Sequence, residues 1–210
     1  MTILVYQTYF PCLAQAALML QAEKVYMEVC GNYEKQTYRN RTLIYGANGK
    51  QTLSIPVHYT QTKRQLYKDV RISYAEPWQA DHKKAIEAAY KSSPFFEFYE
   101  YELLPLFERK DTFLLDFNTA CFEKIEQCLD ISVVLENSMT FEKTPSKTQD
   151  YRTLVNPKTL TSALVSYTQV FSSKYGFIDN LSILDLLFNE GPNSVNYLLK
   201  QQVRFIEQAS

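Results

Sequence analysis

One short stretch of the chain concentrates side chains that can bind an anion. Residues 35–41 read Lys-Gln-Thr-Tyr-Arg-Asn-Arg. If this stretch is an extended strand, its period of two places Lys35, Arg39 and Arg41 on one face, with Arg39 and Arg41 about 7 Å apart. Two guanidinium groups at that distance can grip one phosphate or carboxylate, and Lys35, about 20 Å from Arg41, joins them only through a bend or a longer ligand. The equally weighted alternative is a solvated strand face that blunts a sheet edge.

His82 is the best single candidate for proton transfer. At helical spacing it shares a face with Trp78, Ile86 and Ala89. Its ordinary pKa of about 6.5 suits a general acid or base near neutral pH, whereas a lone histidine on an apolar helix face is more often a hydrogen-bonded core residue. His58 has no obvious ligand partner and the chain lacks an H-E-x-x-H motif, so we predict no metal site.

The composition excludes several classes of protein. The chain has 210 residues, of which 46% are hydrophobic and 21% charged, and this favours one compact domain over residues 1–210. The balance of 22 Lys and Arg against 23 Asp and Glu argues against a generally basic surface, so we predict no nucleic-acid partner. Apolar runs fall far short of the roughly 20 residues of a spanning helix, and residues 1–10 lack an export-signal pattern. We therefore expect a cytoplasmic protein without a membrane span.

Known cofactor and nucleophile motifs are missing from the sequence. There is no P-loop, no G-x-S-x-G elbow, no kinase motif and no dinucleotide-binding glycine fingerprint. The 4 cysteines include no C-x-x-C pair, so buried free thiols are favoured over a zinc or redox role. The cofactor, if there is one, is unknown from the sequence.

The elements that must position these side chains begin with a β-α-β unit. A strand at 2–6, a helix at 13–21 and a strand at 24–30 follow one another within about 30 residues, and such a crossover makes the two strands parallel. Gln7 and Tyr9 come at the end of the first strand, where open α/β sheets bind ligands. We therefore include both residues in the candidate site.

An Asn-Gly hairpin follows the cationic stretch. Asn48 and Gly49 lie between β-rich runs at 41–45 and 51–57, which is the strongest short-range hairpin signal. The remaining expected elements are strands at 67–74 and 131–136 and helices at 78–91, 95–109, 116–129, 182–190 and from 194 onward. The sequence thus predicts an α/β fold with a mixed sheet, an N-terminal β-α-β unit and a hairpin, packed by several helices.

Several strings in the chain resemble the WbqC-like family of bacterial proteins. They lie at residues 7–11, 35–41, 47–57, 78–90, 93–96 and 181–192, in the same order along nearly the whole chain. The Arg-Asn-Arg triplet, the Asn-Gly hairpin and the final Leu-Ser-Ile-Leu-Asp-Leu-Leu-Phe-Asn-Glu-Gly-Pro string are specific in combination. The form of the cationic string resembles the branch common in Bacteroidetes-type bacteria.

The resemblance extends to the long polar segment 137–161. Arg152 in Asp-Tyr-Arg and Lys158 in Pro-Lys look like family positions, which implies that this segment is part of the site. Many members carry a histidine-glutamine-proline string near the start. Here Tyr6 occupies the histidine position and Thr8 replaces the proline, so no catalytic role of that histidine carries over.

The resemblance also implies a function, because the family's named founder belongs to O-antigen gene clusters. We expect a transferase-like enzyme that acts on an anionic, activated-sugar or nucleotide-sugar-like precursor in cell-surface polysaccharide biosynthesis, with His82 as the catalytic residue. The expected ligand-binding residues are Gln7, Tyr9, Lys35, Arg39, Asn40, Arg41, Asn48, Arg152 and Lys158. The alternative is a noncatalytic binding or assembly protein with a basic-aromatic face. Convergence of the cations and His82 on one concave pocket favours the enzyme.

Overall fold

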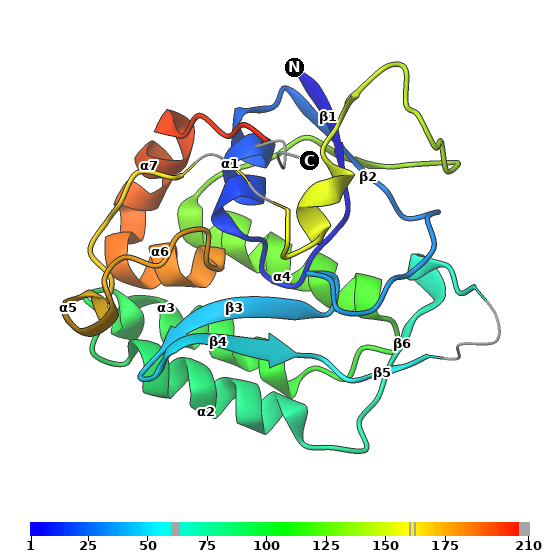
Figure 1. Ribbon diagram of the computed structural model, residues 1–210. Coiled ribbons are helices and arrows are strands. Elements are labelled where there is room, and N and C mark those ends of the chain that lie inside the picture. Colours follow the sequence, from blue (N-terminus) through cyan, green and yellow to red (C-terminus); the bar gives the residue numbers. More distant parts are fainter. Residues whose placement is uncertain (60–63, 160, 162, 206–210) are drawn as a thin grey trace.

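A four-stranded parallel sheet forms one end of the molecule, at the top of Figure 1. The computed structural model describes residues 1–59, 64–159, 161 and 163–205. The strands are β1 (Thr2–Val5), β2 (Lys24–Met27), β7 (Leu135–Asn137) and β8 (Gln149–Asp150), in the order β7-β2-β1-β8. Helix α1 (Leu13–Gln21) joins β1 to β2, and these strands pair in parallel. The predicted β-α-β unit is confirmed.

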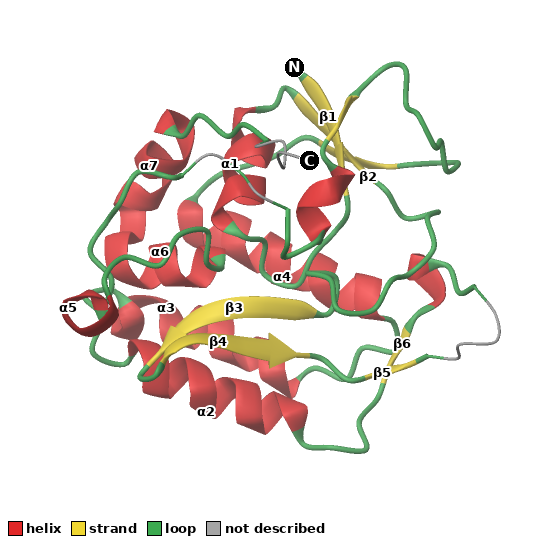
Figure 2. Ribbon diagram, in the orientation of Figure 1, coloured by secondary structure: helices red, strands yellow, loops and turns green. Residues whose placement is uncertain are grey.

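The predicted hairpin and most of the predicted helices are present as well. Strand β3 (Arg41–Gly46) pairs antiparallel with β4 (Gly49–Ser54), and Gly49 adopts φ +97° at the turn, which favours glycine. A short antiparallel pair joins β5 (Val57–His58) to β6 (Arg71–Ile72). The helices are α2 (Trp78–Tyr90), α3 (Phe96–Leu103), α4 (Leu114–Leu129), α5 (Ser172–Tyr175), α6 (Ile183–Glu190) and α7 (Ser194–Lys200). Figure 2 shows helices around the sheet and the hairpin, so the predicted α/β class is confirmed.

The two faces of the parallel sheet differ in what covers them. The side chains that alternate toward one face, those of Ile3, Val5, Val25 and Met27, are at most 3% exposed and belong to the hydrophobic core. Leu4 and Tyr26 point to the other face, which the connection 138–148 covers. Parallel sheets usually carry helices on both faces. Coverage by a loop instead leaves space for cavities on this side.

Two predicted strands are shorter than expected. The region 67–74 begins with a 3-10 helix (Tyr67–Asp69), and only Arg71–Ile72 form a strand. The Tyr67 side chain is fully buried and its hydroxyl donates to the backbone oxygen of Gln7, which anchors this turn in the core. The expected strand at 131–136 forms only from Leu135 onward. Alternation of residue types therefore located these regions but overestimated their extended length.

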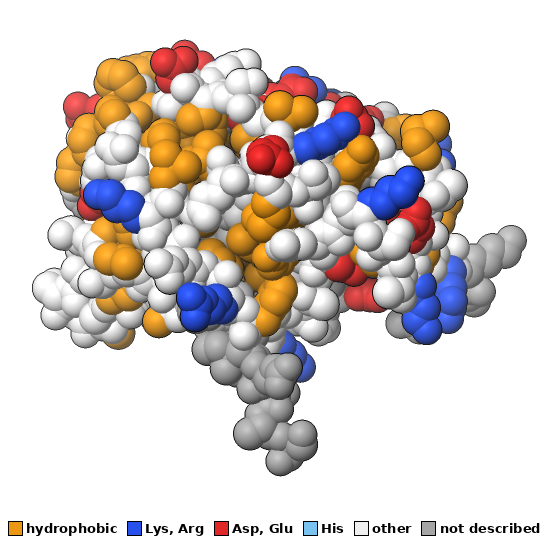
Figure 3. All heavy atoms as spheres, turned by 90° about the horizontal axis from the view of Figure 1, so that it is seen from above, with side chains coloured by type: hydrophobic (Ala, Val, Ile, Leu, Met, Phe, Trp, Pro, Cys, Tyr) orange, Lys and Arg blue, Asp and Glu red, His pale blue; other side chains and the backbone are white. Residues whose placement is uncertain are grey.

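The surface charges and the cysteines give few further indications of where a functional site lies. Seen from above, Lys and Arg side chains lie at separate places among acidic and apolar ones (Figure 3). In the part of the chain that the structure describes, no helix has the length and apolarity to cross a membrane, and no three His, Cys, Asp or Glu side chains form a group suited to a metal ion. All four cysteines are free, with Cys12 and Cys121 buried and Cys30 and Cys128 half-buried.

Candidate functional site

The strand order reverses between β1 and β8. The chain places β2 and then β7 on one side of β1 and returns to place β8 on the other. In open α/β sheets, ligands bind in the crevice outside the carboxyl ends of the strands at such a reversal. Here that position holds a cavity of about 320 Å³, lined by Tyr6, Glu34, Arg39, Asp150 and Arg152 together with residues of the segment 153–159. We call it the arginine pocket.

Arg39 is held in the arginine pocket by backbone and aromatic contacts. The residue is only 1% exposed, and its guanidinium carbon lies 3.9 Å from the centroid of the Tyr6 ring. Its Nη1 donates to the backbone oxygen of Asn32 at 2.6 Å, and its Nη2 lies 3.8 Å from the Glu34 carboxylate. Its Nε is buried without a hydrogen-bond partner among the described residues. Arg39 is therefore positioned firmly while part of its donor capacity is unused.

Arg152 reaches the same pocket from the 3-10 helix Arg152–Val155 that follows β8. Its Nε and Nη2 donate to both oxygens of Asp150, at 2.9 Å and 2.6 Å. These bonds raise the pKa of Arg152. Burial raises the pKa of Asp150, but the bonds from Arg152 outweigh burial and the pKa lies below its ordinary value. Both groups are charged at neutral pH.

Glu28 is a site residue that sequence reasoning missed. It is 1% exposed, and its Oε1 accepts hydrogen bonds from the backbone N–H groups of Cys30 and Gly31 and from the Ser138 hydroxyl. Its Oε2 lies 3.4 Å from Nη1 of Arg152. These bonds turn the chain away from the sheet, so the strand expected at 24–30 ends at Met27. An acidic residue directly after an apolar strand is the signal that could have identified it.

The arginine pocket therefore balances two cations against nearby carboxylates. Arg39 faces Glu34, while Arg152 lies between Asp150 and Glu28. The donor atoms with the most bonding capacity left are Nε and Nη2 of Arg39 and Nη1 of Arg152. Guanidinium groups suit phosphate and carboxylate oxygens because they present several N–H donors in one plane. The arrangement can hold an anionic group between residues that are more than a hundred positions apart in the sequence.

Comparison with known proteins identifies the family of this chain. Residues 7–163, more than half of the chain and a span that includes Glu28, Arg39 and Arg152, match the WbqC-like protein family. The chain belongs to this family. A curated relative described as uncharacterized protein Rv1507c of Mycobacterium tuberculosis is 27% identical over 195 residues, which cover 79% of this chain and 83% of the relative. No solved structure matches the chain. Membership of the Bacteroidetes-type branch stays a prediction.

In this WbqC-like protein the prediction of an extended cationic face at residues 35–41 is wrong. Residues 35–40 form turns and bends, with Gln36 at φ +63° and the Thr37 hydroxyl bonded to the backbone oxygen of Glu34. The turns separate the three cations. Lys35 is exposed, with its Nζ 4.4 Å from the centroid of the Tyr59 ring, and Arg41 is half-buried at the start of β3. Neither lines the arginine pocket.

The predicted amides and Lys158 do not line the arginine pocket either, although Lys158 lies between its lining residues Asn156 and Thr159. Asn40 Nδ2 donates to the backbone oxygen of Ile55 at 2.9 Å and thereby fixes the start of the hairpin. Asn48 is exposed at the hairpin turn, and Lys158 is exposed on the segment after Val155. Gln7 donates to the backbone oxygen of Asn118 and lines a separate cavity of about 240 Å³. A ligand role for these four residues stays a prediction.

His82 lies inside an aromatic cluster. It is 5% exposed and its Nδ1 is 3.0 Å from the Tyr9 hydroxyl, while Trp78 and Phe107 contact its ring edge-on. Burial lowers the pKa of His82 to about 4, against a raising effect of a hydrogen bond to the backbone of Ser54. His82 is therefore neutral at physiological pH and lines neither of the two cavities described above. Proton transfer by His82 stays a prediction.

Proposed function

We propose that this protein is a cytoplasmic transferase that binds an anionic, activated-sugar precursor of a cell-surface polysaccharide in the arginine pocket. Of the cations and His82, whose convergence would favour an enzyme, Arg39 and Arg152 line one cavity and the others do not. The meeting of these two arginines at the reversal of strand order is the observation that carries the proposal. The free donors of Arg39 and Nη1 of Arg152 would hold a phosphate or carboxylate of the precursor. The family resemblance to O-antigen gene products supports the choice of an activated sugar.

A thermal-shift screen against nucleotide sugars tests the binding step. We expect at least one of UDP-N-acetylglucosamine, UDP-glucose and GDP-mannose to stabilise the protein, because a ligand at about 100 times its dissociation constant adds roughly 2.7 kcal/mol. Arg39→Lys keeps the charge but removes the paired donors, so affinity should fall about 10- to 100-fold. Arg71→Lys is the matched control, since Arg71 is exposed on β6 beside Phe113.

Two outcomes would count against the proposal. If none of the nucleotide sugars shifts the melting temperature, the proposed binding of an activated sugar is contradicted. If Arg39→Lys and the unmodified protein bind with equal affinity, the arginine pocket is not the binding site. Release of free nucleotide from a bound nucleotide sugar in the presence of an acceptor separates a transferase from the noncatalytic alternative. Binding without release under any acceptor would favour the binding or assembly protein.

A further inference from the structure

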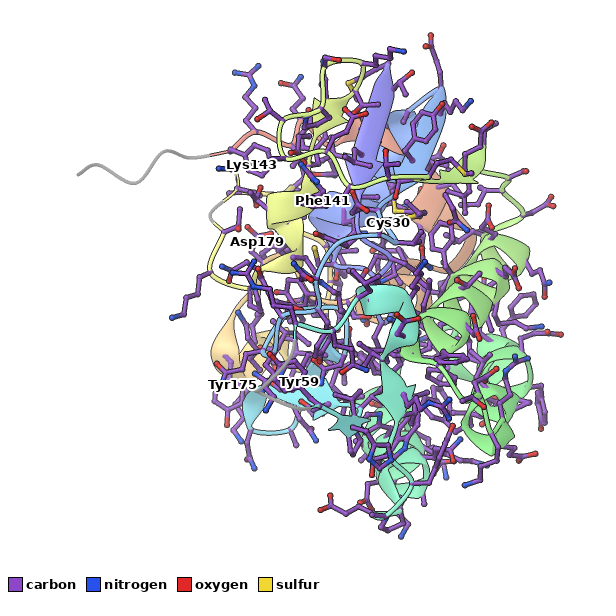
Figure 4. The ribbon with its side chains drawn as sticks, turned by 90° about the vertical axis from the view of Figure 1, so that its right-hand side faces the viewer. Cys30, Tyr59, Phe141, Lys143, Tyr175 and Asp179 are labelled. Carbon is purple, nitrogen blue, oxygen red and sulfur yellow. The ribbon has the colours of Figure 1, made fainter. Side chains whose placement is uncertain are left out.

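A second cavity lies beside the arginine pocket, on the loop-covered face of the sheet. It measures about 220 Å³, and the loop 138–148 closes it against Leu4 of β1 and Tyr26 of β2. Figure 4 views this side and labels Phe141 and Lys143 of the loop, and Cys30, in the upper part of the molecule, above Tyr59. We call this cavity the loop pocket. It is smaller than the roughly 300–1,000 Å³ of sites for drug-sized ligands, so it suits one ring-sized group.

The walls of the loop pocket combine an apolar surface with a few polar groups. Leu4, Met139 and the ring of Tyr26 supply apolar contact area, and Glu28 and Thr148 supply oxygen atoms. Oγ1 of Thr148 is buried and has no hydrogen-bond partner among the described residues. Oε2 of Glu28 has a single contact there, the long one to Arg152. Buried polar atoms usually have a partner, so these two oxygens are suited to a ligand with hydroxyl groups.

The charge of the loop pocket differs from that of the arginine pocket. Its lining contains the carboxylates of Glu28 and Glu142 and a single ammonium group, that of Lys147, whereas the two guanidinium groups of the arginine pocket equal in number its two carboxylates, Glu34 and Asp150. An excess of carboxylate disfavours a phosphate or carboxylate ligand. A neutral ligand with hydroxyl donors matches Oε2 of Glu28, which has only the long contact to Arg152 among the described residues, and the Thr148 hydroxyl, which can both donate and accept.

The Glu28–Arg152 ion pair connects the two cavities. Glu28 lines the loop pocket, Arg152 lines the arginine pocket, and 3.4 Å separates Oε2 of the one from Nη1 of the other. A group in each cavity would therefore lie against one member of this pair. Such proximity is what a transfer between two bound molecules needs, because holding reactants side by side removes much of the entropic cost of their encounter.

We infer that the loop pocket is the acceptor half of a bipartite site and binds an uncharged, hydroxyl-bearing ring of pyranose size. This inference rests on the proposed function, in which the arginine pocket holds the activated donor. Glu28 and Thr148 bind hydroxyl groups of the acceptor, and the Tyr26 ring packs against its face. In the transfer, an acceptor hydroxyl oxygen bonds to the anomeric carbon of the donor sugar as that carbon's bond to the nucleoside diphosphate breaks. The diphosphate leaves on the guanidinium groups of the arginine pocket, and the hydroxyl proton passes to the Glu28 carboxylate. Glu28 thereby becomes a binding residue of one half and a positioning residue for Arg152 in the other.

Saturation-transfer NMR with methyl β-D-glucopyranoside, methyl β-D-galactopyranoside and methyl 2-acetamido-2-deoxy-β-D-glucopyranoside tests this site, with UDP as the probe of the arginine pocket. We expect at least one glycoside to bind. Thr148→Val removes the unpartnered hydroxyl without changing the shape, and it should weaken glycoside binding about 2- to 10-fold. Thr153→Val makes the same change in the arginine pocket and should leave glycoside binding unchanged.

A second pair of variants tests the aromatic wall. Tyr26→Leu should weaken the glycoside by a similar factor, whereas Tyr101→Leu, on the exposed face of α3, should have no effect. UDP should bind Thr148→Val and Tyr26→Leu as it binds the unmodified protein, which also shows that both variants are folded, and it should bind Arg39→Lys more weakly.

The outcomes separate this inference from the proposed function. UDP binding without binding of any glycoside overturns the acceptor half and leaves the arginine pocket standing. If a glycoside binds but Thr148→Val and Tyr26→Leu do not weaken its binding, the sugar binds elsewhere and the acceptor half is again overturned. Glycoside binding in the loop pocket without UDP binding supports the sugar site and overturns the anionic donor. Failure of both probes overturns both.

Discussion

The arginine pocket and the aromatic cluster around His82 both bury polar groups, but they differ in the bonding capacity that remains. Arg39 keeps an Nε that has no hydrogen-bond partner among the described residues and lies beside a cavity. His82 bonds to the Tyr9 hydroxyl and to the backbone of Ser54, and aromatic rings surround it. A buried polar group can take part in binding only if donors or acceptors are left over and a ligand can reach them. By this criterion the arginine pocket is the stronger candidate site.

Several changes test this comparison of the two regions. Glu28→Ala is expected to have the largest effect on the free energy of unfolding. The change removes the ion pair of Glu28 with Arg152. It also removes the acceptor of the backbone N–H groups of Cys30 and Gly31. Removal of one partner from a buried ion pair costs about 3–5 kcal/mol. We expect urea denaturation to show a loss of this size. Glu142→Ala, on the exposed part of the same loop, is the control and should change stability by no more than about 0.5 kcal/mol. A loss below about 1 kcal/mol for Glu28→Ala would mean that the strand ends are not tied together by this carboxylate.

Glu28 also marks the limit of what the sequence could predict. The β-α-β unit and the Asn-Gly hairpin were predictable because each depends on residues close in the chain. The extended face of 35–41 was not, since the positive φ of Gln36 and the bond from Thr37 to Glu34 turn the chain where the residue types allowed a strand. The Glu28–Arg152 contact joins residues 124 positions apart, and only the register of three parallel strands brings them together.

The next effect, expected to be about half as large, is a loss of stability in acid that arises in the His82 cluster. The pKa of His82 is lowered to about 4 in the folded protein, against about 6.5 in the unfolded chain. The unfolded state therefore binds the proton more readily, so this contribution to stability is fully present above pH 6.5 and is lost as the pH falls toward 4. Between pH 7.5 and pH 5 we expect a loss of about 2 kcal/mol.

Urea denaturation of the unmodified protein and of His82→Gln at both pH values isolates this contribution from that of the carboxylates. The variant should lack the step of about 2 kcal/mol and should bind nucleotide sugars as the unmodified protein does. An identical pH dependence in both proteins would show that His82 is not held neutral by burial. A variant that folds and binds normally but has lost nucleotide release would restore His82 as the proton-transfer residue.

The smallest effect concerns Tyr9, whose hydroxyl bonds to Nδ1 of His82. Tyr9→Phe keeps the ring that contacts Phe10, Phe117 and His82 and removes only that bond. We expect urea denaturation to show a loss of about 1 kcal/mol, the usual net contribution of one buried hydrogen bond. Tyr101→Phe, with its side chain 80% exposed, should show none. If the His82 cluster only packs the core, ligand affinity in the arginine pocket will be unchanged in Tyr9→Phe. A fall in that affinity or in nucleotide release, measured where the variant is fully folded, would instead show that the aromatic cluster and the arginine pocket act as one site.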